Sequence, residues 1–398
     1  MLRVTLRCAS SGGPTVVSVP AAGGGRLLAL DLPPGEAFLA ELDAAWARGD
    51  AVLPIDPAGA RPAVEQLVAT MQLDEPTPPG TAVVIGTSGS TGRPKGVVLS
   101  HLALEASARA TMARIGIEAG DRWLSCLPWH HIAGLQVALR ARLFGLPLVV
   151  HERFDAARVA AEASVTLVSL VPTQLVRLLD AGADLARFRV VLLGGAAAWP
   201  ALLDRARAAG APVVTTYGMT ETCGGCVYDG VPLDGVQVRI DDQSRIWLRG
   251  PMLMSGYRLD GRLTDETLRD GWLRTSDLGS WDGERLVVHG RVDDVVVTGG
   301  ENVVATEVAA VVADHPSVRD VAVVGVPDPQ WGQRVVAVVV PVPAGAPTLP
   351  ELRTWVSARV SAAAAPRQLV LVEAIPRLPS GKLDRSAVTG WAAAAAPT

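Results

Sequence analysis

The sequence predicts an α/β fold in which a large N-terminal domain of doubly wound sheets, with a β-rich part, precedes a small α+β C-terminal domain. Between residues 146 and 216, short apolar runs alternate with helix-like segments, an order typical of a parallel sheet covered by helices. From Val236 onward, β-rich segments separated by turns replace this alternation. The length of 398 residues and the 49% share of apolar side chains allow one large core and a second, smaller one.

The periodicity of the first half predicts individual elements. Phe38, Leu39, Leu42 and Trp46 share one face of a helix, and a strand with strict alternation begins the chain. The helices predicted here span 36–48, 62–71, 100–115, 135–143, 156–163 and 173–179. The strands predicted here span 2–6, 51–57, 82–85, 146–150, 167–171, 190–196 and 213–216.

The second half predicts a sequence of hairpins and then a compact α+β unit. The strands predicted here span 236–240, 245–249, 271–279, 286–289, 321–326, 335–342 and 368–372. Helices are expected over 307–313 and 349–360, and a loop over 294–302. The Ala-rich tail after Trp391 is expected to fray.

A glycine-rich stretch at 87–96, Thr-Ser-Gly-Ser-Thr-Gly-Arg-Pro-Lys-Gly, is the strongest local signal. Glycines let backbone N–H groups crowd around an anion, hydroxyls add donors, and the ammonium of Lys95 adds a point charge. A solvated Gly/Ser turn is the plain alternative. A Walker-type loop fits poorly, because Gly96 follows Lys95 where that motif has Ser or Thr. The candidate phosphate ligands are Thr87, Ser88, Gly89, Ser90, Thr91, Gly92 and Lys95.

Lysine is almost absent from the chain. Only two of the 36 basic residues are lysines, Lys95 and Lys382, and the others are arginines. Arginine covers most surface roles of lysine but does not replace a compact ammonium acting on a phosphate or carboxylate. Lys382 lies in the run Leu-Pro-Ser-Gly-Lys-Leu-Asp-Arg at 378–385. Both ammonium groups are therefore expected to have a specific task.

Four runs follow one another along the chain: the loop at 87–96, Tyr-Gly-Met-Thr-Glu-Thr at 217–222, Gly-Trp-Leu-Arg-Thr-Ser-Asp at 271–277, and the run at 378–385. Their order is that of the signatures of adenylate-forming enzymes. The chain resembles this family, which includes acyl-CoA and aryl-CoA ligases, luciferases and peptide-synthetase adenylation domains, over about residues 80–390. The resemblance implies that ATP, with Mg²⁺, converts a carboxylic acid into an acyl-adenylate and pyrophosphate. Coenzyme A then accepts the acyl group.

By this resemblance, several runs build the ATP site. Tyr217 stacks on the adenine, Thr220 contacts the α-phosphate, and Glu221 binds Mg²⁺, since a hard cation prefers carboxylate and phosphate oxygens. Asp277 accepts hydrogen bonds from both ribose hydroxyls. The other residues implied in ATP binding are Gly194, Gly195, Ala196, Gly218, Met219 and Arg291.

The resemblance also implies that the C-terminal domain is mobile. We expect an ATP- and acid-binding domain over 1–291 and a mobile domain over 292–398, with Asp293 as the hinge. Lys382 bridges the carboxylate and the α-phosphate in the first half-reaction. After rotation, the turn Gly299-Gly300 takes its place, and Gly300 leaves room for the thiol arm of coenzyme A.

The acid pocket is expected beside Trp-His-His-Ile-Ala-Gly at 129–134, where the family places an aromatic residue or His that lines and gates the pocket. We assign His131 to catalysis and acid binding, and Gly218 to the pocket lining. The alternative is a His pair satisfied at a helix start. A zinc site fits poorly, because no third ligand follows at a suitable spacing.

The 86 residues ahead of the loop are fewer than in most of the family. This feature and the runs at 130–136 and 222–230 look most like the o-succinylbenzoate–CoA ligase branch, which acts in menaquinone biosynthesis. That acid carries two carboxylates, so the one that is not activated needs a cation. Arg140 is the candidate and Arg142 the fallback, against the alternative of a surface arginine. Ligation of another aryl or short-chain acid is a rival interpretation.

A non-catalytic nucleotide-binding relative is a second rival, which predicts loss of Lys382, Glu221 or Asp277, and all three are present. The net charge of −4 gives no basic footprint for nucleic acid, and no apolar run reaches the roughly 20 residues of a membrane helix. Four cysteines make no disulfide framework, and the CxxC at 223–226 lacks a second pair. We expect a cytoplasmic enzyme whose partners are small molecules, with a homodimer left open.

Overall fold

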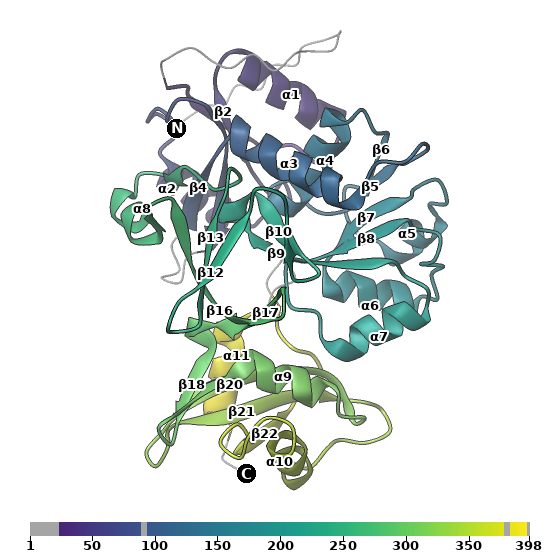
Figure 1. Cartoon of the computed structure of the whole chain (residues 1–398), viewed down its shortest axis with the longest axis vertical. Coiled ribbons are helices and arrows are strands. Elements are labelled where there is room, and N and C mark those ends of the chain that lie inside the picture. Colours follow the sequence, from purple (N-terminus) through teal and green to yellow (C-terminus); the bar gives the residue numbers. More distant parts are fainter. Residues whose placement is uncertain (1–23, 89–93, 378–382, 396–398) are drawn as a thin grey trace.

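The computed structural model describes residues 24–88, 94–377 and 383–395, and within them the chain forms four sheets with helices packed around them (Figure 1). The strand predicted over 2–6, five residues of the glycine-rich loop (89–93, which include the predicted ligands Gly89, Ser90, Thr91 and Gly92) and Lys382 lie outside the described residues. A large N-terminal part and a small C-terminal part are evident, which confirms the predicted fold class.

The first sheet combines the two ends of the N-terminal part. Its strand order is β1-β2-β3-β4-β14, with bounds Leu27–Leu30, Ala51–Pro54, Thr81–Ser88, Pro94–Ser100 and Gly256–Tyr257. Strands β1 to β3 are parallel, whereas β4 and β14 run antiparallel to their neighbours. Strand β14 comes from far along the chain, so it brings residues near 257 to the hairpin formed by β3 and β4.

The second sheet is the doubly wound one. Its order is β11-β10-β9-β8-β7-β5-β6, with bounds Val231–Pro232, Gly224–Tyr228, Val213–Met219, Val190–Leu193, Leu167–Leu170, Trp123–Ser125 and Leu148–Val150. The strands from β6 to β9 are parallel, as the alternation of strands and helices predicts. Strands β10 and β11 add an antiparallel edge, because a tight 3₁₀ turn (η1, Thr220–Thr222) sends the chain straight back after β9.

Helices α3 and α4 lie between these two sheets and supply side chains to the cores on both sides. Helices α5, α6 and α7 cover the opposite face of the second sheet, and α2 covers the outer face of the first. Ser100 caps α3 by accepting from the N–H of Ala103, which fixes the start of the helix predicted over 100–115. The bounds of α1 to α8 are Glu36–Ala47, Arg61–Met71, His101–Ile115, Ile132–Leu143, Ala156–Ala161, Pro172–Asp180, Pro200–Ala208 and Gly261–Thr267.

The third sheet is antiparallel and leads to the C-terminal part. It has the order β12-β13-β16-β15 with β17 on β16, and the bounds are Gln237–Ile240, Arg245–Arg249, Trp272–Asp282, Leu268–Arg269 and Arg285–Arg291. A short 3₁₀ turn, η2 (Val292–Asp294), follows β17 at the place where the sequence predicts the domain boundary. That boundary stays a prediction.

The C-terminal part has a fourth sheet with helices on both faces. The strands β18 to β22 span Val295–Thr298, Glu301–Val304, Val318–Asp328, Gly332–Pro341 and Gln368–Leu371. Helices α9 (Ala305–Ala313) and α10 (Leu349–Ser357) pack on one face, and α11 (Arg385–Ala394) packs on the other. Alternation of valines along β20 and β21 supplies both cores.

Two expectations for this part are wrong. The segment predicted as a loop over 294–302 contains the hairpin β18–β19, which pairs in register from Val295 to Val304. The tail is not frayed directly after Trp391, because α11 continues to Ala394 and buries Val388 and Ala392 against the sheet. Alanine favours a helix once one face of it finds an apolar partner.

Candidate active site

The glycine-rich loop is carried by the hairpin of β3 and β4. Thr87 lies opposite Lys95, and Ser88, the last residue of β3, lies opposite Pro94. The hydroxyl of Thr87 donates to the backbone carbonyl of Lys95 at 3.4 Å. The hairpin therefore brings the two ends of the predicted phosphate loop together, as a loop that encloses an anion requires.

Lys95 and Glu221 both contact the same tyrosine, Tyr257. The ammonium of Lys95 lies 5.1 Å from the centroid of the Tyr257 ring. The hydroxyl of Tyr257 donates to Oε1 of Glu221 at 2.8 Å. Burial first, and then the nearby negative charge of Glu221, raise the pKa of Tyr257, so its hydroxyl stays a donor. The predicted phosphate and metal ligands are thus brought together.

Sequence reasoning missed Tyr257. It lies on the two-residue strand β14, in a turn-rich stretch that no recognised run covers. A usable signal exists nonetheless: the chain has only three tyrosines, so the scarcity argument that singles out the lysines applies to tyrosine too.

The predicted run 217–222 extends β9 and then turns through η1. Tyr217, Gly218 and Met219 lie in β9, whereas Thr220 and Glu221 lie in η1. A Cβ at Gly218 would lie 2.1 Å from the carbonyl oxygen of Gly224, so the pairing of β9 with β10 already requires glycine here. This requirement leaves the predicted ligand role of Gly218 untested.

Tyr217, Asp277 and Arg291, which the sequence predicts to bind the adenosine part of ATP, lie together. The hydroxyl of Tyr217 donates to Oδ2 of Asp277 at 2.8 Å. Strand pairing sets Asp277 opposite Arg291, and Nη1 of Arg291 lies 3.6 Å from Oδ1 of Asp277. The second terminal nitrogen, Nη2, lies 3.6 Å from Oδ2 of Asp293, the predicted hinge residue. One guanidinium thus connects the predicted ribose ligand with the predicted hinge.

The glycines at the carboxyl end of β8 border the same region. A Cβ at Gly194 would lie 2.1 Å from Oγ1 of Thr216, the residue before Tyr217, which explains the glycine by close strand packing. Gly195 has a φ of +78° and, like Ala196, is exposed. Ligands of open α/β sheets bind at the carboxyl ends of the strands, where these residues lie.

The two adjacent histidines mark the start of α4. His131 occupies the N-cap position, and its ring lies 4.4 Å from that of His130. Nδ1 of His130 lies 3.9 Å from Oδ1 of Asp56. Burial lowers the pKa of His130, and the charge of Asp56 offsets part of this effect. The position at a helix start agrees with the plain alternative and leaves a role of His131 toward the acid open.

Arg140 is deeply buried and has no acidic partner among the residues that the structure describes. Its exposed fraction is 4%, so the surface-arginine alternative is wrong. Its guanidinium carbon lies 5.9 Å from the centroid of the Trp123 ring, and Nε has no hydrogen-bond partner. Among the described residues, no carboxylate forms a salt bridge with it. Burial lowers the pKa of Arg140, and Tyr228 and Cys223 offset part of this effect.

The surroundings of Arg140 connect it with the end of β9, where the sequence predicts nucleotide ligands. A Cβ at Gly224 would lie 4.0 Å from Nη2 of Arg140, and Gly224 pairs with Met219 at the end of β9. Arg142, the fallback, points elsewhere and forms an ion pair with Asp43 of α1. An unpaired cation in the interior is costly unless an anion joins it. The structure therefore favours Arg140 over Arg142 as an anion-binding residue.

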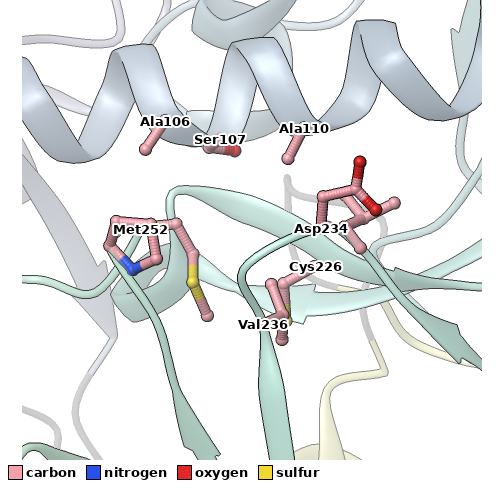
Figure 2. A pocket seen from close by; sticks show the side chains of 10 residues that line it. Ala106, Ser107, Ala110, Cys226, Asp234, Val236 and Met252 are labelled. Carbon is pink, nitrogen blue, oxygen red and sulfur yellow. The ribbon is translucent and has the colours of Figure 1, made fainter.

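Two further features are a small internal cavity and the two cysteines of the CxxC run at 223–226. A cavity of about 10 Å³ between α3 and the start of β10, lined by Ser107, Cys226 and Met252 among others, has room for about one water and none for an organic acid (Figure 2). Cys223 and Cys226 are both buried, and no group of three metal-ligating side chains occurs among the described residues.

The turn Gly299-Gly300 lies within the C-terminal part. The N–H of Gly299 donates to the carbonyl of Trp331 in the adjacent turn. Gly300 has a φ of +85°, and a Cβ there would meet open space. Beyond Lys382, Arg385 pairs at 2.7 Å with Asp294, next to the predicted hinge.

Two family models and several curated proteins match this chain. The AMP-binding enzyme family matches residues 27–258, and the AMP-binding enzyme C-terminal domain matches residues 307–382. A probable 2-succinylbenzoate–CoA ligase of Mycobacterium tuberculosis is 43% identical over 81% of this chain and 88% of its own length. A 2-succinylbenzoate–CoA ligase of Listeria monocytogenes is 34% identical over 77% of this chain and 69% of its own length.

Solved structures give the same picture. The o-succinylbenzoate CoA synthetase of Bacillus subtilis, in complex with its acyl-adenylate intermediate, is 27% identical, with a TM-score of 0.81 over 92% of this chain and 88% of that one. The same synthetase with ATP and magnesium ion has a TM-score of 0.80 over 91% and 89%. The two family matches leave residues 259–306 between them, the segment that contains Asp277, Arg291 and Asp293.

Proposed function

The chain belongs to the AMP-binding enzyme family and is an AMP-forming acid–thiol ligase, and we propose that the acid it activates is o-succinylbenzoate, as a step of menaquinone biosynthesis. In the first half-reaction the acid carboxylate attacks the α-phosphate of ATP, and pyrophosphate leaves. In the second, the thiolate of coenzyme A attacks the acyl carbonyl, and AMP leaves. Relatives with this activity in their names, at up to 43% identity, support the proposal.

The observation that carries the choice of acid is the buried guanidinium of Arg140, which has no salt bridge to any described residue and whose Nε has no hydrogen-bond partner. A monocarboxylic acid presents its only carboxylate to ATP and leaves such a cation without an anion. An acid with a second carboxylate supplies that anion, and the pair then forms charge-assisted hydrogen bonds in a protected place. We assign Arg140 to the carboxylate that is not activated, and His131 and Gly218 to the pocket between that carboxylate and the nucleotide.

A second group of residues is assigned to ATP and its metal ion. Glu221 is a carboxylate with a neutral phenol as its donor, and no salt bridge to it occurs in the described part of the chain, so it fits a divalent cation. When bound, Mg²⁺ neutralises phosphate charge and helps pyrophosphate leave. Thr220 is assigned to the α-phosphate and Lys95 to the leaving phosphates. The adenine is assigned to Tyr217, and the ribose to Asp277 and Arg291.

The protein contributes mainly position and charge, because attack of an oxygen nucleophile on a phosphate asks for little covalent chemistry from side chains. Lys382 is assigned to bridging the acid carboxylate and the α-phosphate. Rotation of the C-terminal domain (292–398) about Asp293 would then withdraw Lys382 and present Gly299-Gly300 to coenzyme A. The contact of Arg291 with Asp293 supports a hinge that responds to the nucleotide site.

The test is a coupled pyrophosphate-release assay with ATP and Mg²⁺ over a panel of carboxylic acids, with and without coenzyme A. We expect turnover with o-succinylbenzoate that requires coenzyme A for the thioester. Turnover with other aryl or short-chain acids alone would keep the ligase chemistry and reject the dicarboxylate assignment. Absence of pyrophosphate with every acid would favour the non-catalytic nucleotide-binding interpretation.

Two wider proposals accompany the assignment. We place the enzyme in the cytoplasm, where ATP and coenzyme A are available, and we leave a homodimer as a hypothesis for sedimentation analysis. No helix among the described residues is long and apolar enough to cross a membrane.

A further inference from the structure

Tyr257 contacts two of the assigned site residues at once. The side chain is 8% exposed. Its hydroxyl donates to Oε1 of Glu221 at 2.8 Å, and its ring face lies 5.1 Å from the ammonium of Lys95. One rigid ring thus joins the only assigned metal ligand to the lysine of the phosphate loop.

The backbone of residues 254–258 also connects η1, which contains Glu221, with β4, which contains Lys95. The N–H of Met254 donates to the carbonyl of Glu221 at 2.8 Å, and the N–H of Ser255 donates to the carbonyl of Val98 at 2.9 Å. The N–H of Arg258 donates to the carbonyl of Gly96 at 2.7 Å. We call residues 254–258 the linking segment, because it is bonded to η1 at one end and to β4 along its length.

A buried arginine anchors the linking segment on its far side. Arg258 is 7% exposed, and its guanidinium donates to the carbonyls of Met71 (2.5 Å), the last residue of α2, and of Gln72 (2.7 Å) and Glu75 (2.6 Å) just beyond that helix. The backbone is therefore bonded on both sides of Tyr257, at Met254 and Ser255 before it and at Arg258 after it, which holds the ring in place.

The orientation of the Glu221 carboxylate matters because the proposed metal site has few protein ligands. Among the described residues no group of three His, Cys, Asp or Glu side chains gathers, so Glu221 would share the cation with phosphate oxygens and water. A donor on Oε1 leaves Oε2 for the cation and fixes the plane of the carboxylate. Groups that orient a ligating carboxylate in this way change metal affinity by about 10- to 100-fold when they are removed.

We propose that Tyr257 is a positioning residue: its hydroxyl orients the Glu221 carboxylate toward the divalent cation of the bound nucleotide, and its ring holds the Lys95 ammonium beside the same phosphates. The inference rests on the proposed function and adds to it a residue that acts through two others. The electron-rich face of an aromatic ring attracts a cation, so the Tyr257 ring restricts the flexible lysine stem.

Two variants separate the two roles. Tyr257→Phe removes the hydroxyl and keeps the ring, whereas Tyr257→Leu removes both. Each full-length protein would be saturated with a non-hydrolysable ATP analogue and titrated with Mn²⁺, with free Mn²⁺ followed by electron paramagnetic resonance. For Tyr257→Phe we expect Mn²⁺ affinity to fall by about 10- to 100-fold, and the Mg²⁺ concentration for half-maximal pyrophosphate release to rise by the same factor. Tyr257→Leu should also weaken binding of the analogue without metal.

Tyr228→Phe is the matched control. That tyrosine is 2% exposed, and its hydroxyl bonds to Thr111 at 3.0 Å, so the variant loses an equally buried hydroxyl away from Glu221. Its Mn²⁺ affinity should equal that of the wild type. Wild-type Mn²⁺ affinity in Tyr257→Phe would overturn the inference while the ligase activity stood. A wild-type protein that neither binds Mn²⁺ with the analogue nor releases pyrophosphate would overturn the proposed function as well.

Discussion

The hydroxyl of Tyr217 donates a hydrogen bond of 2.8 Å to Oδ2 of Asp277, a residue 60 positions further along the chain. Asp277 is 8% exposed, so its carboxylate depends on such donors. The bond ties the end of β9 to β16 and holds the proposed adenine and ribose contacts at a fixed separation. Burial first, and then the charge of Asp277, raise the pKa of Tyr217 and keep its hydroxyl protonated.

Removal of this hydroxyl should affect stability more than nucleotide affinity. In Tyr217→Phe, Asp277 loses one donor, and the free energy of unfolding without nucleotide should fall by about 1–3 kcal/mol. The ring remains to contact adenine, and ribose hydroxyls can replace the lost donor, so AMP should restore much of the stability. Urea unfolding with and without AMP measures both effects. Loss of AMP binding as severe as in Asp277→Asn would mean that the tyrosine hydroxyl itself binds the nucleotide.

Arg140→Met should separate function from stability. The KM for o-succinylbenzoate should rise by about 10- to 100-fold, the value of one charge-assisted interaction, with less change in kcat. The melting temperature should stay level or rise, because an unpaired buried charge is replaced by an apolar side chain of similar length. Steady-state kinetics and calorimetry measure the two quantities.

Arg142→Met is the control on the same helix, since it breaks only the partly exposed ion pair with Asp43. Such pairs contribute about 0–1 kcal/mol, and the KM should not change. If Arg140→Met raised the KM for an acid without a second carboxylate as much as it raises the KM for o-succinylbenzoate, Arg140 would act on the pocket as a whole.

Lys382→Ala should separate the two half-reactions. Acyl-adenylate formation should slow by roughly 10²- to 10³-fold, the cost of losing one preorganised charge donor. Thioester formation from supplied acyl-adenylate should persist, because the proposed second conformation withdraws this lysine. Lys382→Arg keeps the charge in another shape and should also be slow in the first step. An equal loss in both steps would contradict the alternating roles of the C-terminal domain.

The ion pair between Asp121 and Arg189 should make the stability of the fold sensitive to acid. Asp121 accepts from Nε and Nη2 of Arg189 at 2.9 and 2.5 Å, and is itself 3% exposed. Burial alone would raise the pKa of Asp121, but hydrogen bonds from Arg189, the N–H of Glu118 and the hydroxyl of Thr166 lower it overall. The folded pKa thus lies below the unfolded value of about 3.9, so this stabilisation is complete above that pH and is lost as pH falls through the folded pKa.

Asp121→Asn tests this directly. At neutral pH its free energy of unfolding should be about 2–4 kcal/mol below that of the wild type, since Arg189 loses its carboxylate. The difference should shrink as the pH drops below about 4. Denaturant unfolding across pH 3–7 measures it. A difference independent of pH would assign the cost to packing rather than to the ion pair.

The sequence predicts most of this fold because its signals are local. Ser100 and the apolar spacing that follows it specify α3, and valine alternation specifies β20 and β21. The features that the sequence does not predict depend on contacts between residues that are distant in the chain. Helical spacing shows that Arg140 and Arg142 face different directions, but only the packing of α4 between two sheets decides which is buried. Tyr257 gains its place from β4 and η1, which no pattern near 257 records.

Arg291 contacts both Asp277 and Asp293, at 3.6 Å each. Because a single side chain contacts both carboxylates, we expect a bound nucleotide that rearranges the contact at Asp277 to alter the contact at Asp293 as well. Thermodynamic reciprocity then requires that the orientation of the C-terminal domain alter nucleotide affinity by the same factor. If the C-terminal domain rotates about Asp293 as proposed, Arg291 would couple nucleotide binding at Asp277 to that rotation, and the order of substrate binding and domain movement would depend on this one side chain.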